Sequence, residues 1–162
     1  MKKSLLMSVL SLIFLMVLGW DAHAQMPNPY GLSINLEAAK KVAASAIAEA
    51  RKNNWTMAVA ITDVGGNLIY FEKMDGTQTG SVKVALDKSS SAVLFKRPTK
   101  AFQDGVAAGG EGLRILRLRG AAPVEGGLPL LMDGKIVGAI GVSGGTSQQD
   151  GLAAKAGADT LK

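Results

Sequence analysis

The chain of 162 residues contains no cysteine and one histidine, His23, and it carries 18 basic and 13 acidic residues. Without cysteine it forms neither a disulfide nor a thiolate site for zinc, and a Ser-His-Asp triad would depend on His23. The positive charge mildly favours anionic ligands, but no aromatic residues are interleaved with the basic clusters, so nucleic acid is not an expected partner.

The N-terminus has the three parts of a secretory signal peptide. Lys2 and Lys3 form a basic start, an uncharged apolar run covers residues 5–18, and Ala22-His23-Ala24 matches a small-x-small cleavage site. Residues 1–24 are therefore predicted to be a signal peptide, and residues 25–162 a single exported domain in the periplasm or outside the cell. The apolar run is shorter than the roughly 20 residues of a spanning helix, so no stable membrane insertion is expected after cleavage.

Cleavage would change the available chemistry, because the only histidine leaves with the signal peptide. Removing Lys2, Lys3 and Asp21 leaves 16 basic and 12 acidic residues, a net charge of +4. The mature chain would then hold neither imidazole nor thiol, which excludes a Ser-His-Asp triad, a cysteine nucleophile and a zinc site of the usual ligands.

The first half of the mature chain predicts a helix followed by a β-hairpin. Asn35 is the expected N-cap of a helix that ends near residues 53–54, with an apolar face that is mostly alanine. A strand over 55–63 is apolar on both faces, so we expect it to be covered on both sides. Gly65-Gly66-Asn67 then turns the chain into a partner strand over 68–74.

A second helix is predicted over residues 81–95. Ser81 is its expected N-cap, and Pro98 ends it because the residue before a proline is disfavoured in helical geometry. Thr99 is expected to cap one further short turn, and the glycine-rich segment 104–112 is expected to be a loop.

The last part of the chain predicts a second hairpin and a final helix. Two apolar segments, 128–132 and 135–142, flank Asp133-Gly134, a dipeptide typical of hairpin turns. A helix over about 148–161 follows. Because hairpins rather than crossovers join the strands, we predict an α/β (α+β) fold: one antiparallel sheet with helices packed on its faces.

Two residues in these elements raise chemical questions. Ser143 lies in a G-x-S-x-G pattern, but that motif needs a parallel sheet and a later histidine, so we interpret its glycines as backbone features of the strand end. The backbone N–H groups of residues 143–147 are a candidate anion site. Lys88 lies on the second helix and, if it faces inward, must be paired or must extend to solvent, because burying a lone ammonium is costly.

Several blocks together resemble a known family. They are AVAITDVGGNLIYFEKMDG, then Ser81, Ala85, Lys88 and Ala92 on one helix, then FKRPT, and finally GGLPLLMDGKIVGAIGVSGGTSQQD. In this order they are similar to the GlcG/HbpS-like family, also called the haem-degrading domain family. The resemblance covers the chain from about Leu32 onward and implies a profilin-like fold, assembly into homo-oligomers and, in one branch, haem binding. It also implies that Thr99, which follows Pro98, lies near the haem iron.

The resemblance favours a binding protein for haem or another planar, anionic tetrapyrrole. We expect the cofactor-binding residues to lie around the end of the second helix: Lys88, Phe95, Arg97, Thr99 and, through its backbone, Ser143. Phe95 offers a ring for a planar ligand, and Arg97 and Lys100 can meet its carboxylates, Arg97 through two parallel hydrogen bonds. Without a mature histidine, the axial ligand of the iron would be Thr99, Tyr30, Tyr70, a methionine or a lysine.

A second hypothesis is an enzyme for a small oxygenated metabolite, with Asp63 or Lys88 as the acid-base group. In either case a homo-oligomer is expected, with the apolar runs 113–118 and 128–132 as candidate interface segments.

Overall fold

The computed structural model describes residues 26–161, so the predicted signal peptide lies outside the described residues. At its centre is a four-stranded sheet in the order β2-β1-β4-β3, in which every neighbouring pair is antiparallel. The strands are β1 (Ala58–Thr62), β2 (Leu68–Lys73), β3 (Gly127–Met132) and β4 (Lys135–Ser143). Both predicted hairpins, β1–β2 and β3–β4, are confirmed.

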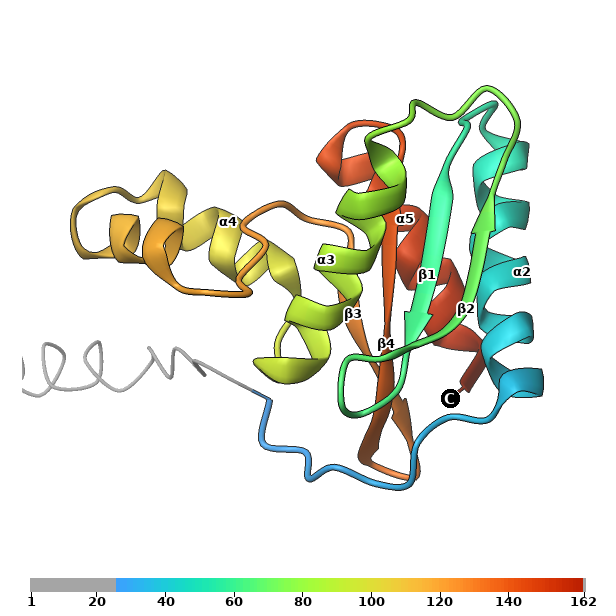
Figure 1. The fold of residues 1–162 in the computed structure, drawn as a ribbon, viewed down its shortest axis with the longest axis horizontal. Helices are drawn as coiled ribbons and strands as arrows, with labels where there is room; N and C mark the ends of the chain where they lie inside the picture. Colours follow the sequence, from blue (N-terminus) through green and yellow to red (C-terminus); the bar gives the residue numbers. More distant parts are fainter. Residues whose placement is uncertain (1–25, 162) are drawn as a thin grey trace, which may run out of the picture.

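Helices cover both faces of this sheet (Figure 1). α2 (Leu36–Lys52) and α5 (Ser147–Ala158) pack side by side on one face, α3 (Ser81–Leu94) covers the other, and a short 3-10 helix, η2 (Asp159–Leu161), ends the described chain. The predicted α+β architecture is therefore confirmed. Among the described residues, no helix is long and apolar enough to cross a membrane.

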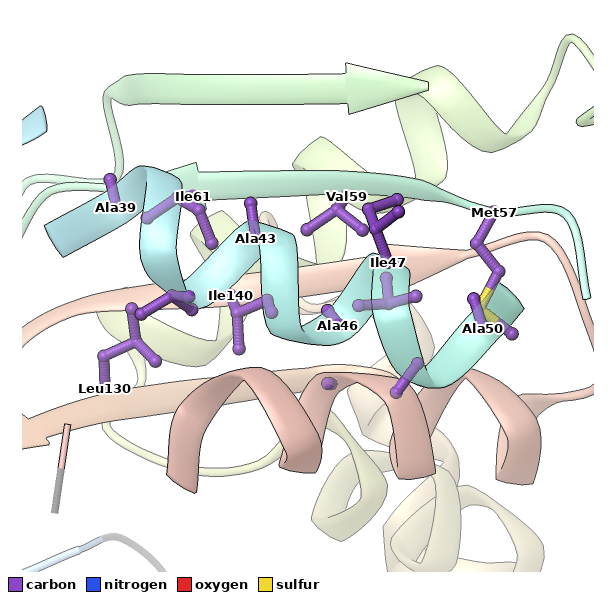
Figure 2. Close-up of a cluster of buried hydrophobic side chains, with 14 of the residues drawn as sticks. Ala39, Ala43, Ala46, Ile47, Ala50, Met57, Val59, Ile61, Leu130 and Ile140 are labelled. Carbon is purple, nitrogen blue, oxygen red and sulfur yellow. The ribbon is translucent and has the colours of Figure 1, made fainter. Parts of the chain in front are cut away.

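The larger core lies between the sheet and the pair α2 and α5 (Figure 2). Val59 and Ile61 of β1, and Met57 directly before it, extend into this core and are fully buried. Burying each such side chain contributes roughly 1.5–3 kcal/mol. The expected alanine face of α2 is buried here, at Ala39, Ala43, Ala46 and Ala50, and Asn35 caps the helix by accepting a hydrogen bond from the Ala38 N–H (2.9 Å). Leu36, the first residue of α2, is exposed.

The face of the sheet toward α3 is lined with small residues. Ala58, Ala60 and Ala139 are fully buried on this side, and a Cβ at Gly141 would lie 2.1 Å from the carbonyl oxygen of Ala85 on α3. α3 therefore packs almost directly on the sheet backbone. At this short distance hydroxyl groups, rather than large aliphatic side chains, make contacts between α3 and the sheet. The Ser89 hydroxyl pairs with that of Thr62 (2.7 Å) and donates to the carbonyl of Ala139.

Two local predictions between α3 and β3 are wrong. The N-cap of α3 is Gly80, and Ser81 is the first helical residue, with its hydroxyl bonded to the Ser143 hydroxyl (3.2 Å). The segment 104–112 is not a plain loop, because α4 (Thr99–Ala107) runs into it and the 3-10 helix η1 (Gly110–Arg117) begins in it. Packing explains the second error: a Cβ at Gly112 would lie 1.8 Å from the Gly105 carbonyl oxygen, so the glycines let α4 and η1 make backbone contact.

α4 and η1 lie to one side of the sheet, in the segment coloured yellow to orange in Figure 1. We call residues 96–124 the arm. It leaves the body after the end of α3 and returns just before β3. Hydrogen bonds from the Glu125 N–H to the Gln103 side chain (2.8 Å) and from the Ala122 N–H to the Ser91 hydroxyl (3.0 Å) hold its base.

The close approach of α3 to β4 makes a specific prediction for stability. Gly141→Ala places a methyl group against backbone that cannot move without shifting α3, so we expect a loss of about 1–3 kcal/mol or more in the free energy of unfolding. Gly80→Ala is the matched control, because a Cβ there meets nothing within 4 Å. Urea unfolding of both variants checks this, and equal stability of the two would contradict the packing described here.

Candidate functional site

A pocket of about 410 Å³ lies along the free edge of β3. Its wall is largely apolar, with Leu128, Pro129 and Leu131 from β3 and Ala158 from α5. Met26, at the start of the described chain, also lines it and is held by a hydrogen bond from its N–H to the Lys96 carbonyl (2.6 Å). The pocket is thus built where the sheet edge, α5 and the beginning of α4 meet.

Four charged residues line the same pocket: Lys100 and Lys155, and the carboxylates Glu125 and Asp159. Lys100 lies near the start of α4 and pairs with Asp104 (2.7 Å), while Lys155 lies on α5 and pairs with Asp159. The hydrogen bond that Lys100 donates to the Asp104 carboxylate raises the pKa of Lys100, which favours its charged form. Both ion pairs are solvent-exposed, and exposed pairs of this kind contribute only about 0–1 kcal/mol.

Gly126 and Gly127 form part of the pocket lining, and polar side chains lie directly behind them. The Thr99 hydroxyl accepts a hydrogen bond from the Gly127 N–H (2.9 Å) and is fully buried. A Cβ at Gly126 would lie 2.8 Å from the Lys88 ammonium nitrogen, and one at Gly127 would lie 2.6 Å from Cγ2 of Thr99. Lys88 and Thr99 therefore support the pocket from the layer beneath its surface. Thr99 does not cap α4, because its hydroxyl is used by Gly127.

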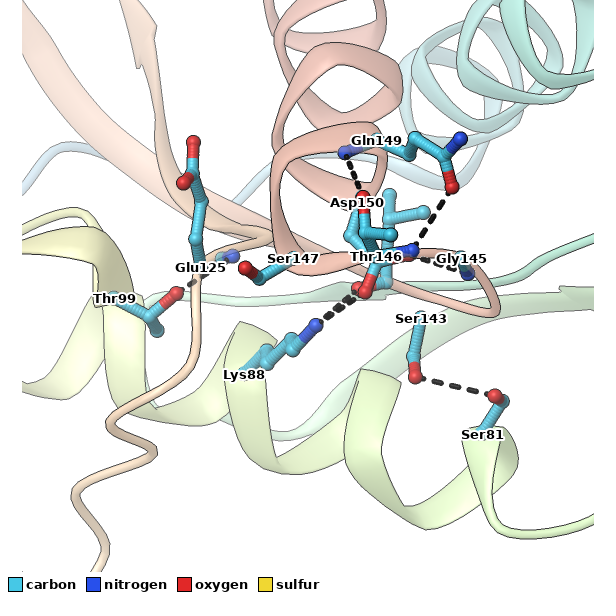
Figure 3. A network of polar contacts seen from close by, with 12 residues as sticks. Ser81, Lys88, Thr99, Glu125, Ser143, Gly145, Thr146, Ser147, Gln149 and Asp150 are labelled. Carbon is cyan, nitrogen blue, oxygen red and sulfur yellow. Dashed lines mark hydrogen bonds and ion pairs between the residues drawn. The ribbon is translucent and has the colours of Figure 1, made fainter. Parts of the chain in front are cut away.

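Lys88 is buried and paired. Its side chain is 1% exposed and donates to Oδ2 of Asp150 (2.7 Å) and to the Val142 carbonyl (3.0 Å), as Figure 3 shows for the carboxylate. This satisfies the requirement that an inward-facing Lys88 must be paired. Burial raises the pKa of Asp150, against the opposing effects of the Lys88 ammonium and of the backbone N–H groups of Gly145 and Gly144.

Two of the backbone N–H groups expected to bind an anion over residues 143–147 donate hydrogen bonds within the protein. The Gly145 N–H donates to Oδ1 of Asp150 (3.0 Å), and the Thr146 N–H donates to the Gln149 side chain (2.9 Å) in a capping box at the start of α5. Ser143 pairs with Ala58 in the antiparallel sheet, and its hydroxyl bonds to that of Ser81. This is not the strand-to-helix turn of a parallel sheet that a nucleophilic serine in this motif requires.

Phe95 and Arg97 form a separate cluster at the corner between α3 and α4. The Phe95 and Phe102 rings meet edge to face with centroids 5.3 Å apart, and the Arg97 guanidinium lies 5.0 Å from the centroid of the Phe102 ring. Nε of Arg97 also donates to the Phe95 carbonyl (3.2 Å). Neither residue is among those that line the pocket.

None of the five predicted site residues lines the pocket. Lys88 and Thr99 lie behind its glycines, Phe95 and Arg97 pack at the neighbouring corner, and Ser143 lies at the end of β4. The sequence did not predict that Met26 and Lys155 line a pocket. For Lys155 a signal was present, because it and Asp159 are four residues apart on the predicted last helix, a spacing that brings both to one face.

Asp63, the other candidate acid-base group, shapes the β1–β2 turn. One of its carboxylate oxygens accepts hydrogen bonds from the N–H groups of Gly65 and Asn67, both 2.8 Å long. Partial burial acts to raise its pKa, but the hydrogen bonds from Asn67, Gly65 and Gly66 outweigh it and lower the pKa overall. A carboxylate that stays ionised and engaged in this way is poorly suited to proton transfer near neutral pH.

Tyr30 and Tyr70 were also candidate ligands of the haem iron. Burial raises the pKa of Tyr30, whose hydroxyl donates to the Val93 carbonyl (2.7 Å), and burial together with Glu72 raises the pKa of Tyr70. Neither tyrosine lines the pocket. Within residues 26–161, no group of three or more histidine, cysteine, aspartate or glutamate side chains is placed to hold a metal ion.

The Lys88–Asp150 pair gives a testable energetic prediction. Lys88→Met leaves the Asp150 carboxylate buried without its cation, so we expect a loss of about 3–5 kcal/mol in the free energy of unfolding. Lys88→Met combined with Asp150→Leu removes both charges and should recover most of that loss. Urea unfolding measures all three proteins. A single variant within about 1 kcal/mol of the wild type would show that the pair is not buried as described.

Comparison with known proteins agrees with this architecture. Residues 34–159 match the family described as haem degrading protein HbpS-like. Protein GlcG of Escherichia coli (strain K12) is 35% identical over 110 residues, which are 68% of this chain and 81% of GlcG.

Two solved structures have the same fold. A crystal structure of a double mutant of Streptomyces reticuli HbpS is 30% identical with a TM-score of 0.74, covering 82% of this chain and 89% of that chain. A PduOC complex with haem has a TM-score of 0.72 over 81% of this chain and 96% of that chain, and at 23% identity it shows the fold alone. From the match over residues 34–159 and the identity to GlcG, the chain belongs to the HbpS-like haem degrading family.

Proposed function

We propose that this protein is an exported binding protein for haem or a related planar, anionic tetrapyrrole, and that the ligand occupies the pocket at the edge of β3. The observation that carries the proposal is an apolar pocket lined by a lysine from each of two helices, in a chain of the HbpS-like family. A tetrapyrrole of this class has the matching chemistry, with an apolar ring system and carboxylate side chains.

The residues present suit such a ligand. Leu128, Pro129 and Leu131 provide the apolar surface on which a flat ring can be buried, and burial of apolar surface is the main source of affinity for a ligand of this kind. The Met26 thioether is a type of ligand that haem iron accepts, as are some oxygen ligands. When bound, haem would bring the redox and oxygen chemistry of its iron to this edge of the sheet.

The two lysines can exchange partners at little cost. Lys100 and Lys155 already hold carboxylates in exposed ion pairs, so replacing Asp104 and Asp159 by ligand carboxylates gives up weak interactions. Thr99 and Lys88 support the adjacent backbone through Gly127 and behind Gly126. In this proposal they are positioning residues rather than ligand contacts.

The arrangement favours binding over proton-transfer catalysis. Lys88 is 1% exposed and ion-paired, and Asp63 is engaged in a turn with a lowered pKa, so neither candidate acid-base group is available to a substrate in the pocket. Arg97 remains a candidate carboxylate contact only if the ligand extends over the α3–α4 corner.

We expect the mature protein to bind hemin saturably at one equivalent per chain, seen as a Soret shift. Lys100→Gln combined with Lys155→Gln should weaken this binding roughly tenfold, since each lysine contributes up to about 1 kcal/mol to a partly exposed ion pair. Lys40→Gln with Lys52→Gln removes the same charge from exposed positions on α2 and should leave the affinity unchanged.

Two outcomes of this titration would contradict the proposal. If hemin produces no saturable shift, the chain is not a haem-binding protein. If Arg97→Lys weakens binding while the Lys100 and Lys155 double variant does not, the ligand lies at the α3–α4 corner instead.

Export and self-association stay predictions from the sequence. Exposed Met132, in the expected interface run 128–132, is compatible with self-association. Mass spectrometry of protein recovered from the periplasm should give an N-terminus at residue 25, and light scattering should give more than one chain per particle. An intact Met1 would contradict the first prediction, and a strict monomer at micromolar concentration the second.

A further inference from the structure

The charge of the chain is concentrated in the arm. Residues 96–124 contain six basic and two acidic residues, a net charge of +4. The rest of the described chain, residues 26–95 and 125–161, contains nine basic and ten acidic residues, a net charge of −1. The net positive charge of the described residues is therefore carried by a segment that lies to one side of the sheet (Figure 1).

The same segment exposes large apolar side chains. Leu113, Leu116 and Leu118, in η1 and at its end, are 49%, 59% and 44% exposed. In a 3-10 helix residues three apart lie on one face, so Leu113 and Leu116 share one face and Arg114 and Arg117 share the next. The third face holds Ile115, which packs against α4 at Gly105. The outer surface of η1 is thus a row of leucines beside a row of arginines.

This surface is held in place rather than formed by a flexible loop. The glycine contact between α4 and η1 fixes the 3-10 helix on the arm, and hydrogen bonds at Gln103 and Ser91 fix the base of the arm. The Arg114 side chain pairs only with the exposed Glu111, an interaction that is easily exchanged for another anion.

We propose that the arm binds the surface of an anionic lipid bilayer, with the leucines of η1 inserted at the headgroup level and the arginines on lipid phosphates. Leucines on one face and arginines beside them are the pattern of interfacial helices, and each basic residue near an anionic surface adds about a factor of five in affinity. A second copy of this chain is the weaker match, because its body has a net charge of −1 and a second arm would repel the first. Surface binding requires no spanning segment, and it is independent of the haem proposal.

Flotation of the mature protein with lipid vesicles tests this proposal. Vesicles containing phosphatidylglycerol should bind the protein, binding should weaken as salt rises, and vesicles of phosphatidylcholine alone should not bind it. Arg114→Gln with Arg117→Gln should reduce binding to the anionic vesicles about 25-fold. Leu113→Ser with Leu116→Ser should reduce it at least tenfold, since about 0.8 kcal/mol is lost per buried CH₂.

Matched control variants test whether vesicle binding depends on the arm itself or only on net charge and on exposed leucine. Lys40→Gln with Lys52→Gln makes the same change in net charge on α2, and Leu152→Ser removes a leucine of α5 that is 56% exposed. Both should bind anionic vesicles like the wild type. Absence of vesicle binding, or equal loss in the α2 control, would overturn the proposal. So would a leucine variant that dissociates a stable oligomer in light scattering without changing vesicle binding, since the arm would then be covered by a second copy.

Discussion

The buried ion pair between Lys88 and Asp150 joins the two sides of this fold. Lys88 belongs to α3 on one face of the sheet, and Asp150 belongs to the first turns of α5, which packs on the other face. The ammonium also bonds the Val142 carbonyl of β4, so one side chain connects both helices to the strand between them. Burying two charges requires their desolvation, which the short 2.7 Å contact and the Gly145 N–H on the carboxylate offset.

The position of that pair depends on glycine. Gly126, Gly127 and Gly141 leave the space that Lys88, Thr99 and α3 occupy, and a Cβ at any of them would come within 3 Å of these groups. Gly126 and Gly127 are also among the residues that line the pocket. One packing arrangement, made possible by these glycines, therefore accounts for the Lys88–Asp150 pair, for the short distance between α3 and the sheet, and for part of the pocket wall.

The sequence predicted what local patterns determine. Apolar runs around Asp133-Gly134 and Gly65-Gly66-Asn67 predicted the two hairpins, and Asn35 with the alanine face predicted α2. It could not predict that Lys88 reaches Asp150, since the two are 62 residues apart and their meeting depends on how α3 and α5 pack. For the same reason η1 and the contribution of Met26 to the pocket were missed: both depend on tertiary contacts rather than on periodicity. The family resemblance implied that Thr99 lies near the ligand, and the structure places its side chain behind the pocket wall, at Gly127.

We proposed that the ligand lies on the β3 edge rather than at the α3–α4 corner. Ferric haem is paramagnetic and broadens the NMR signals of nearby amides, so spectra of the labelled mature protein with and without hemin report its position directly. We predict that broadening is strongest for residues 126–131 of the β3 edge, for residues 151–158 of α5 and for Lys100, with Phe95 and Phe102 less affected. Broadening that is strongest at Phe95, Arg97 and Phe102 and weak over residues 126–131, or that is spread evenly over the surface, would contradict this placement of the ligand.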